Sequence, residues 1–110
     1  MQIKNKNIIK FIIFLSFFIL GSSVSADEFN ITANEILIEK DNQVLIGKGS
    51  VTALDKEGRI IKANKITYYK KKKLLLAEEN VIIYDLEGNT LTSNKATFDK
   101  KINLISTYDN

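Results

Sequence analysis

The sequence predicts an all-β protein, an elongated β-jelly-roll or sandwich built from repeats of about 30 residues that follow an N-terminal signal peptide. Three observations support this prediction. Residues 1–26 form a basic and then apolar leader, one motif recurs at a fixed offset, and the apolar residues alternate with a period of two rather than 3.6.

The leader has the three parts of a secretory signal peptide. Residues 1–10 are basic, residues 11–20 are apolar apart from one serine, and residues 24–26 are small, which predicts cleavage between Ala26 and Asp27. The alternative is an uncleaved membrane anchor. A spanning helix needs about 20 apolar residues, and this run has about half that length. We therefore expect one domain, residues 27–110.

The composition argues against catalysis and against nucleic-acid binding. The chain has no His and no Cys, which excludes His-dependent or thiol nucleophiles, zinc fingers and disulfides. We expect no catalytic residues, no cofactor and no metal site. The formal charge of +3 includes Lys4, Lys6 and Lys10 of the leader. Removing these leaves 16 − 3 = 13 basic and 13 acidic residues, so the exported domain is neutral.

The remaining chain is an internal repeat. Residues 31–36 (ITANEI) recur as residues 61–66 (IKANKI) and again, at an equal offset, as residues 91–96 (LTSNKA). Other positions keep the same register, including the D-x-x-G segments at residues 55–58 and 85–88. The third copy is expected to be incomplete, because the counterpart of Val51 and Val81 would be residue 111.

Each copy predicts strands joined by turns. Period-two alternation in Ile-, Val-, Thr- and Tyr-rich segments is typical of strands. Residues 40–43 and 70–73 are polar hairpin connections, and the D-x-x-G segments are turns in which Gly58 can adopt a positive φ. The alternation changes phase at Asn34, at its counterparts in the later copies, and around Gly47 and Gly49. A strand that keeps its apolar residues inside must contain a bulge or a corner at such places.

A signal peptide followed by I-x-A-[DN]-x-[IA], a hairpin, [LV]-x-[AG]-x-[GN]-V, a D-x-x-G turn and a second copy resembles the organic-solvent-tolerance-like (OstA-like) domain of lipopolysaccharide transport proteins. The resemblance covers residues 29–110, and Asn replaces a more usual Asp in each copy. The residues that carry it are Ile31, Ala33, Asn34, Gly49, Val51, Ile61, Ala63, Asn64, Asn80, Val81, Gly88, Leu91 and Asn94.

The resemblance implies a V-shaped β-jelly-roll in the periplasm of a Gram-negative cell, whose apolar interior shields lipopolysaccharide acyl chains on the way to the outer membrane. The implied partners are lipopolysaccharide, other β-jelly-rolls joined by end-to-end strand pairing, and an outer-membrane β-barrel as partner or continuation. The amino-terminal domain of the outer-membrane assembly protein is favoured over a stand-alone periplasmic bridge. The aliphatic residues expected to point inward and line the lipid groove are Ile36, Ile38, Val44, Ile46, Val51, Ile66, Leu74, Leu76, Val81 and Ile83.

Three interpretations stay open. The inward aliphatic residues are equally compatible with an ordinary core, because a core and a lipid groove need the same chemistry. The run Lys70-Lys71-Lys72-Lys73 is either a phosphate-binding site or a solvated turn, and the aligned turns favour the second. A purely structural or adhesive β-solenoid is the alternative from another functional class.

Overall fold

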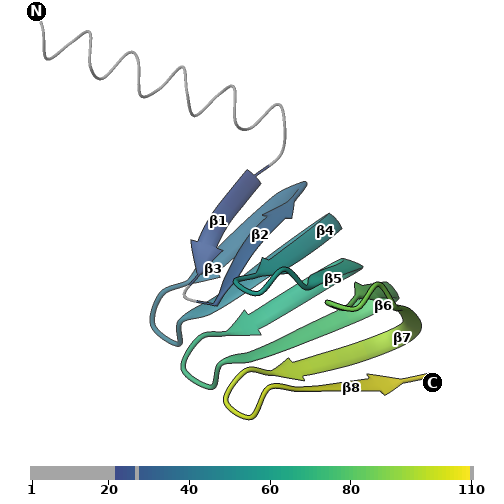
Figure 1. Cartoon of the computed structure of the whole chain (residues 1–110). Helices are drawn as coiled ribbons and strands as arrows, with labels where there is room; N and C mark the ends of the chain where they lie inside the picture. Colours follow the sequence, from purple (N-terminus) through teal and green to yellow (C-terminus); the bar gives the residue numbers. More distant parts are fainter. Residues whose placement is uncertain (1–21, 27, 110) are drawn as a thin grey trace, which may run out of the picture.

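A computed structural model describes residues 22–26 and 28–109 of the chain. Within these residues it contains strands and turns and no helix, which confirms the all-β prediction. Figure 1 shows one antiparallel sheet in which successive strands lie side by side from the N-terminal to the C-terminal end.

The described residues form eight strands, in the spatial order β1-β2-β4-β5-β6-β7-β8, and β3 also pairs with β4. Both β2 and β3 pair with the same side of β4, so together they correspond to one long strand with a break at Asn34. The strands are β1 (Ser22–Ala26), β2 (Phe29–Ala33), β3 (Glu35–Glu39), β4 (Val44–Asp55), β5 (Ile60–Tyr69), β6 (Leu74–Tyr84), β7 (Thr90–Asp99) and β8 (Leu104–Tyr108).

The long strands bend at the places where the sequence changes phase. The pairing register shifts between Lys48 and Val51, and again between Glu78 and Val81. The residues inside these shifts have left-handed backbone conformations, with φ of 80° and 47° at 49 and 50 and of 70° and 55° at 79 and 80. At the first of these bends, the backbone N–H of Asn34 donates a hydrogen bond of 2.9 Å to the backbone carbonyl of Gly49. These bends are bulges that redirect the strands.

The bends divide the sheet into two arms. Arm A consists of residues 22–26, 28–33, 51–63 and 81–93, and arm B consists of residues 35–48, 65–78 and 95–108. From residue 35 on, each of these segments is a pair of strands with its connecting turn, and segments of the same arm recur at the interval of the sequence repeat.

The turns of each arm also repeat one conformation. In arm B the four-residue turns end on a residue with positive φ, namely Gln43 (54°), Lys73 (51°) and Asn103 (57°). In arm A positive φ falls on Gly58 (107°) and Gly88 (87°), where a glycine avoids the strain of a Cβ atom. We name the two arm A turns the Asp55 turn (residues 55–59) and the Asp85 turn (residues 85–89).

The core lies between the arms, on the inner face of the bent sheet. A Cβ atom added to Gly47 of arm B would lie 3.3 Å from the Ala33 Cβ and 3.6 Å from the Ile31 Cγ2 of arm A, so the two arms are packed closely there. The buried apolar residues form one cluster. Its members are Phe29, Ile31, Ala33, Leu45, Val51, Ala53, Ile61, Ala63, Ile66, Tyr68, Leu75, Ala77, Val81, Ile83, Ala96 and Phe98.

The signal-peptide prediction falls mostly on residues 1–21 and on Asp27, which lie outside the described residues. The five residues before the predicted cleavage site are described. They form β1, which pairs antiparallel with β2 from Ser22 opposite Ala33 to Ala26 opposite Phe29. The end of the predicted leader therefore covers the edge of β2.

Candidate functional site

The interior between the arms is the candidate site, and aromatic rings fill its centre. The Phe29 ring of arm A lies with its centroid 5.2 Å from that of Tyr68 and 5.7 Å from that of Phe98, both of arm B. The interplanar angles of 74° and 75° are edge-to-face geometry, which is favourable between aromatic rings. These rings are almost fully buried. In this arrangement the protein's own side chains fill the interior.

Six of the ten predicted groove residues lie on the inner face. Ile66 is 0% exposed, and Val51, Val81 and Ile83 are each 1% exposed. Ile36 is half-buried and packs against the core cluster. Whether any of them also contacts an acyl chain stays a prediction.

The sixth residue, Ile38, lies on the inner face as expected, but its side chain is 57% exposed. It pairs with the buried Leu45, and directly opposed residues of antiparallel strands point to the same face. Its counterparts in the next two copies, Tyr68 and Phe98, are 0% and 1% exposed. Ile38 therefore lies at an end of the interior that arm A does not cover.

The four other predicted groove residues lie on the outer face, and the inward assignment of these four is wrong. They are Val44, Ile46, Leu74 and Leu76, and all are partly buried. In each strand the residue between them, Leu45 or Leu75, pairs with the buried Tyr68 and points inward. Three consecutive apolar residues carry no alternation, so their phase is set by pairing with the neighbouring strand.

Two of these outer aliphatic residues, Leu74 and Leu76, line an open hollow of about 510 Å³ on arm B. Its lining residues come from β5, β6, β7 and β8 and from the turn before β6. They are Tyr69, Lys72, Leu74, Leu76, Lys95, Thr97 and Tyr108.

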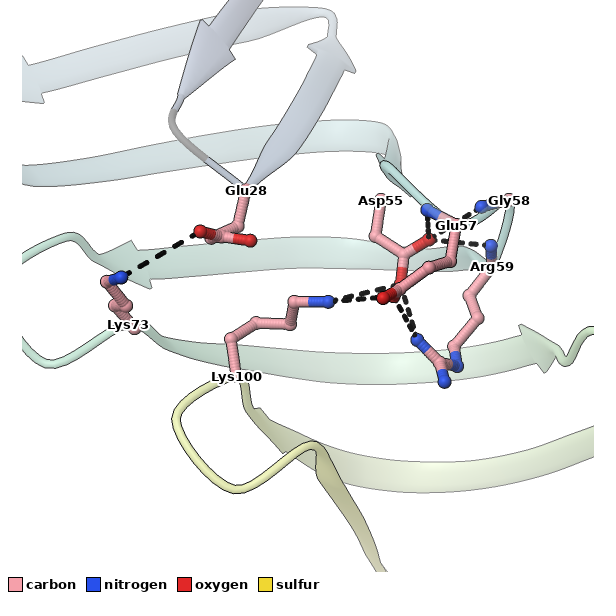
Figure 2. A network of polar contacts seen from close by, with 7 residues as sticks. All are labelled: Glu28, Asp55, Glu57, Gly58, Arg59, Lys73 and Lys100. Atoms are coloured by element: carbon pink, nitrogen blue, oxygen red, sulfur yellow. Dashed lines mark hydrogen bonds and ion pairs between the residues drawn. The ribbon is translucent and has the colours of Figure 1, made fainter.

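A polar cluster closes the interior where the turns of the two arms meet, a region we call the mouth (Figure 2). The Asp55 side chain is fully buried there. Its Oδ1 accepts hydrogen bonds from the backbone N–H groups of Glu57 (2.9 Å), Gly58 (2.8 Å) and Arg59 (2.8 Å). Its Oδ2 accepts a bond of 2.9 Å from Arg59 Nη1. An aspartate that binds the backbone of its own turn fixes that turn locally, and here it also orients Arg59.

Lys100 joins this cluster from the other arm. Its Nζ lies 3.6 Å from Asp55 Oδ2 and 3.0 Å from Glu57 Oε1, and its side chain is only 7% exposed. Arg59 Nη1 lies 2.7 Å from the same Glu57 oxygen. One carboxylate oxygen of Glu57 therefore bridges a cation of arm A and a cation of arm B.

A second, weaker ion pair crosses the mouth beside the first. Lys73 Nζ of arm B lies 3.9 Å from Glu28 Oε2 of arm A (Figure 2), and these two side chains are more exposed than the Lys100 and Asp55 side chains. An exposed pair at this distance contributes little to stability. The main connection across the mouth is therefore the one through Lys100.

The electrostatics of the cluster favour its charged forms. Burial on its own raises the pKa of Asp55, but the hydrogen bonds from Arg59 and the nearby Lys100 outweigh burial and lower that pKa below its ordinary value. Hydrogen bonds from Lys100 and Arg59 likewise lower the pKa of Glu57. The hydrogen bond to Asp55 raises the pKa of Arg59. At neutral pH the cluster holds two cations and two carboxylates.

The two cations lie over the aromatic centre of the interior. Lys100 Nζ is 5.0 Å from the Phe98 ring centroid and 6.0 Å from that of Phe29. The Arg59 guanidinium carbon is 5.4 Å from the Phe98 centroid. Such cation–π contacts are favourable, more so when water is excluded. The mouth thus places charge directly above apolar surface.

The four-lysine run forms the arm B turn at residues 70–73, and its residues are exposed. Lys72 Nζ lies 5.8 Å from the Tyr69 ring centroid, and Lys73 forms the pair with Glu28. The turn geometry agrees with a solvated turn. The phosphate-binding alternative for this run stays a hypothesis.

The mouth cluster was not predicted from the sequence. Residues 55–58 were predicted only as a turn, whereas in the structure Lys100 of the other arm also pairs with the Asp55 carboxylate. The only arginine of the chain, Arg59, was a usable local signal, because it follows the turn that the Asp55 carboxylate organises. The approach of Lys100 depends on how the arms fold together, and no local pattern encodes it.

No protein-family model and no curated protein sequence matches the chain. Among residues 22–26 and 28–109, no three His, Cys, Asp or Glu side chains come together in a way that could bind a metal ion. The same part of the chain has no helix of the length and apolarity that a membrane crossing requires.

Proposed function

We propose that the chain is a lipid-conducting module of lipopolysaccharide transport in the periplasm of a Gram-negative cell. In this proposal the two arms form a V-shaped β-jelly-roll of repeated units, and the interior between them shields acyl chains. One observation carries the proposal. The inner face is largely apolar along the stack of strands, and apolar side chains become exposed on it at both ends, Ile38 at one end and Leu91, near the polar Ser93 and Thr107, at the other.

The exposure of Leu91 illustrates this continuity. Its counterparts Ile31 and Ile61 are 0% and 2% exposed, whereas Leu91 is 46% exposed on the same face. A soluble repeat protein normally ends in units with polar outer surfaces. Exposed apolar side chains at both ends of the inner face suit a path that continues into a neighbouring module.

The binding energy would come from burial alone. Each lipid methylene transferred from water to an apolar interior contributes about 0.8 kcal/mol, so several acyl chains need no catalytic group and no cofactor. We propose accordingly that the protein is not an enzyme.

Strand pairing would supply the partners. Cleavage after Ala26 would remove β1 and leave the edge of β2 free to pair with another β-jelly-roll. We propose end-to-end pairing of this kind within a transport bridge, with an outer-membrane β-barrel as partner or continuation of the chain. The favoured setting is the amino-terminal domain of the outer-membrane assembly protein, and a stand-alone periplasmic bridge is the alternative.

Adjacent residues of β6 provide a matched test. Ile83 points inward and is 1% exposed, whereas Ile82 lies on the outer face. A photo-crosslinking amino acid at Ile83 should capture lipopolysaccharide in living cells, and the same amino acid at Ile82 should not. Ile61 and Leu76 form a second inner and outer pair. Equal capture at inner and outer positions, or none at either, would reject the proposal.

A structural β-solenoid is the second candidate, and the close packing of the interior favours it. Core side chains such as Ile31, Ile66 and Tyr68 are 0% exposed, so acyl chains can enter only if the arms move apart. A structural role predicts filaments of the purified chain and no lipid capture at Ile83. The crosslinking experiment therefore separates the two candidates.

A further inference from the structure

The mouth contains a carboxylate that occupies the place an external anion would take. Glu57 Oε1 lies 2.7 Å from Arg59 Nη1 and 3.0 Å from Lys100 Nζ, and the Glu57 side chain is 51% exposed. The two cations are far less exposed, at 16% and 7%. The anion position thus faces solvent, while the cations that define it are held underneath.

Glu57 is not needed to neutralise a buried group. The buried carboxylate of the cluster is Asp55, which keeps its three backbone N–H donors and both cations if only the Glu57 side chain moves away. Lys100 then loses its 3.0 Å hydrogen bond to Glu57 and keeps its ion pair with Asp55 at 3.6 Å. Glu57 accepts its side-chain bonds only from Arg59 and Lys100 among the described contacts. Moving the Glu57 side chain outward would therefore expose two positively charged donors without leaving an unpaired buried charge.

Apolar surface lies immediately below the two donors. Lys100 Nζ is within 5.0 Å of the Phe98 ring centroid, and Phe98 is 1% exposed. The Phe29 ring beside it belongs to the opposite arm. A ligand with a phosphate at the Glu57 position and a hydrocarbon chain pointing inward would place each part in a matching environment.

We infer that Arg59 and Lys100 form a headgroup site for an anionic amphiphile, and that the Glu57 carboxylate occupies the place of its phosphate when no ligand is bound. This inference rests on the proposed function, because the hydrocarbon chain must enter between the arms at Phe29 and Phe98. Phosphate binds such donors more strongly than a carboxylate does, since it offers more acceptor oxygens and more charge. When a phosphate replaces the Glu57 carboxylate, Arg59 and Lys100 remain paired with an anion. The bridge that Glu57 forms between these two side chains is then released.

The Asp85 turn offers a matched control one unit further along arm A. Its Glu87 stands at the position of Glu57, but Asn89 replaces Arg59 and no described lysine reaches the turn. The same change at the two glutamates therefore removes the same charge, once inside the inferred site and once outside it.

The test uses the chain as it is processed and purified from cells, with dodecyl phosphate, dodecyl maltoside and inorganic phosphate as probes. Binding is followed by the NMR amide signals of Arg59 and Lys100 at the mouth and of Phe29 and Phe98 in the interior. The Glu57→Gln variant should bind dodecyl phosphate about fivefold more tightly than the parent, because the internal competitor has lost its charge. The Glu87→Gln variant should match the parent, and Lys100→Met should lose the preference for phosphate over maltoside.

Each other outcome has a defined meaning. If Glu57→Gln and Glu87→Gln bind dodecyl phosphate equally, the headgroup site is wrong even when both detergents shift the interior signals. If inorganic phosphate alone binds as tightly as dodecyl phosphate, the site is one for free phosphate and the amphiphile inference is overturned. If neither detergent shifts the signals of Phe29 and Phe98, the proposed lipid-binding interior itself fails. Lys100 is buried, so the result for Lys100→Met counts only if urea unfolding shows that this variant is folded. Glu57 is exposed, so the Glu57→Gln variant is expected to fold and decides the test.

Discussion

The Asp55 turn and the Asp85 turn are built alike and end in different surroundings. In both turns the aspartate Oδ1 accepts backbone N–H bonds from residues two and four positions later, at 2.9 and 2.8 Å. In both turns the aspartate N–H also donates a bond of 3.0 Å to the carbonyl four residues later. Local sequence is therefore sufficient to form either turn.

The difference comes from the opposite arm. The Asp55 carboxylate is buried between Arg59 and Lys100, whereas the Asp85 carboxylate binds the Asn89 side chain at 2.9 Å and Asp85 is only partly buried. The strands behind the turns differ in the same way, since Ile61 is 2% exposed and Leu91 is 46% exposed. A repeated local motif therefore acquires a buried ion pair only where the other arm covers it.

The largest expected effect concerns the strands behind the two turns. Ile61→Asp should destabilise the fold by at least about 4 kcal/mol, because it buries an unpaired carboxylate in an apolar interior. Leu91→Asp should cost about 1 kcal/mol or less, since this side chain is already half in water. Urea unfolding followed by far-ultraviolet circular dichroism measures both free energies. Similar losses would mean that Leu91 is covered in solution and that the comparison of the two units is wrong.

The second effect compares the two aspartates directly. Asp55→Ala should cost about 3 kcal/mol, because it leaves buried cations and backbone donors without their acceptor. Asp85→Ala removes a similar set of local bonds in solvent, so its unfolding midpoint should shift clearly less. The same urea titration, run side by side, decides this. An Asp85→Ala variant as unstable as Asp55→Ala would show that the turn alone, and not the link between the arms, carries the stability.

The third effect is the response to acid. Arg59 and Lys100 hold the pKa of Asp55 below its ordinary value of 3.8, against the opposing effect of burial. A carboxylate with a lowered folded-state pKa stabilises the fold above its unfolded pKa, and this contribution is lost as pH falls through the folded value. The free energy of unfolding should therefore fall below about pH 4. The free energy of unfolding should fall less steeply in the Asp55→Asn variant. Urea unfolding of both proteins between pH 7 and pH 2 measures the difference.

The Asp85→Asn variant is the matched comparison for this acid response. The hydrogen bonds from Asn89 and Glu87 also lower the pKa of Asp85, so part of the acid dependence belongs to that turn. Asp85→Asn should keep the part due to Asp55 and Glu57. If Asp55→Asn follows the parent at every pH, the ion pairs of the mouth do not contribute to folding stability.

Features determined by residues close together in the sequence could be predicted from the sequence. The phase changes beside Asn34 and Gly49 mark real bends, because an apolar face that switches parity forces a bulge. The turns at residues 40–43 and 70–73 were also readable, because polar runs separate the apolar strands. These predictions required only the alternation and the repeat register.

Features determined by contacts between residues distant in the sequence could not be predicted in this way. The inward side of the Leu74-Leu75-Leu76 run depends on the pairing of Leu75 with Tyr68, because all three residues are apolar. The exposure of Ile38 depends on how far arm A extends over arm B. The burial of Lys100 depends on the closure of the mouth, and a lysine-rich composition hides such a residue among many solvated ones.

The smallest expected effect is at the arm B turn of residues 70–73, one unit before the turn that carries Lys100. Changing both Lys71 and Lys72 to Ser should leave the free energy of unfolding within about 0.5 kcal/mol of the parent, as for other exposed substitutions. The contact of Lys72 with the Tyr69 ring, at 5.8 Å, is exposed and weak. Dodecyl phosphate affinity should also be unchanged, because these lysines do not lie over the buried aromatic rings. If the double variant instead lost dodecyl phosphate binding while Lys100→Met retained it, the anion site would belong to the lysine run, and burial beneath the opposite arm would not be what selects a headgroup.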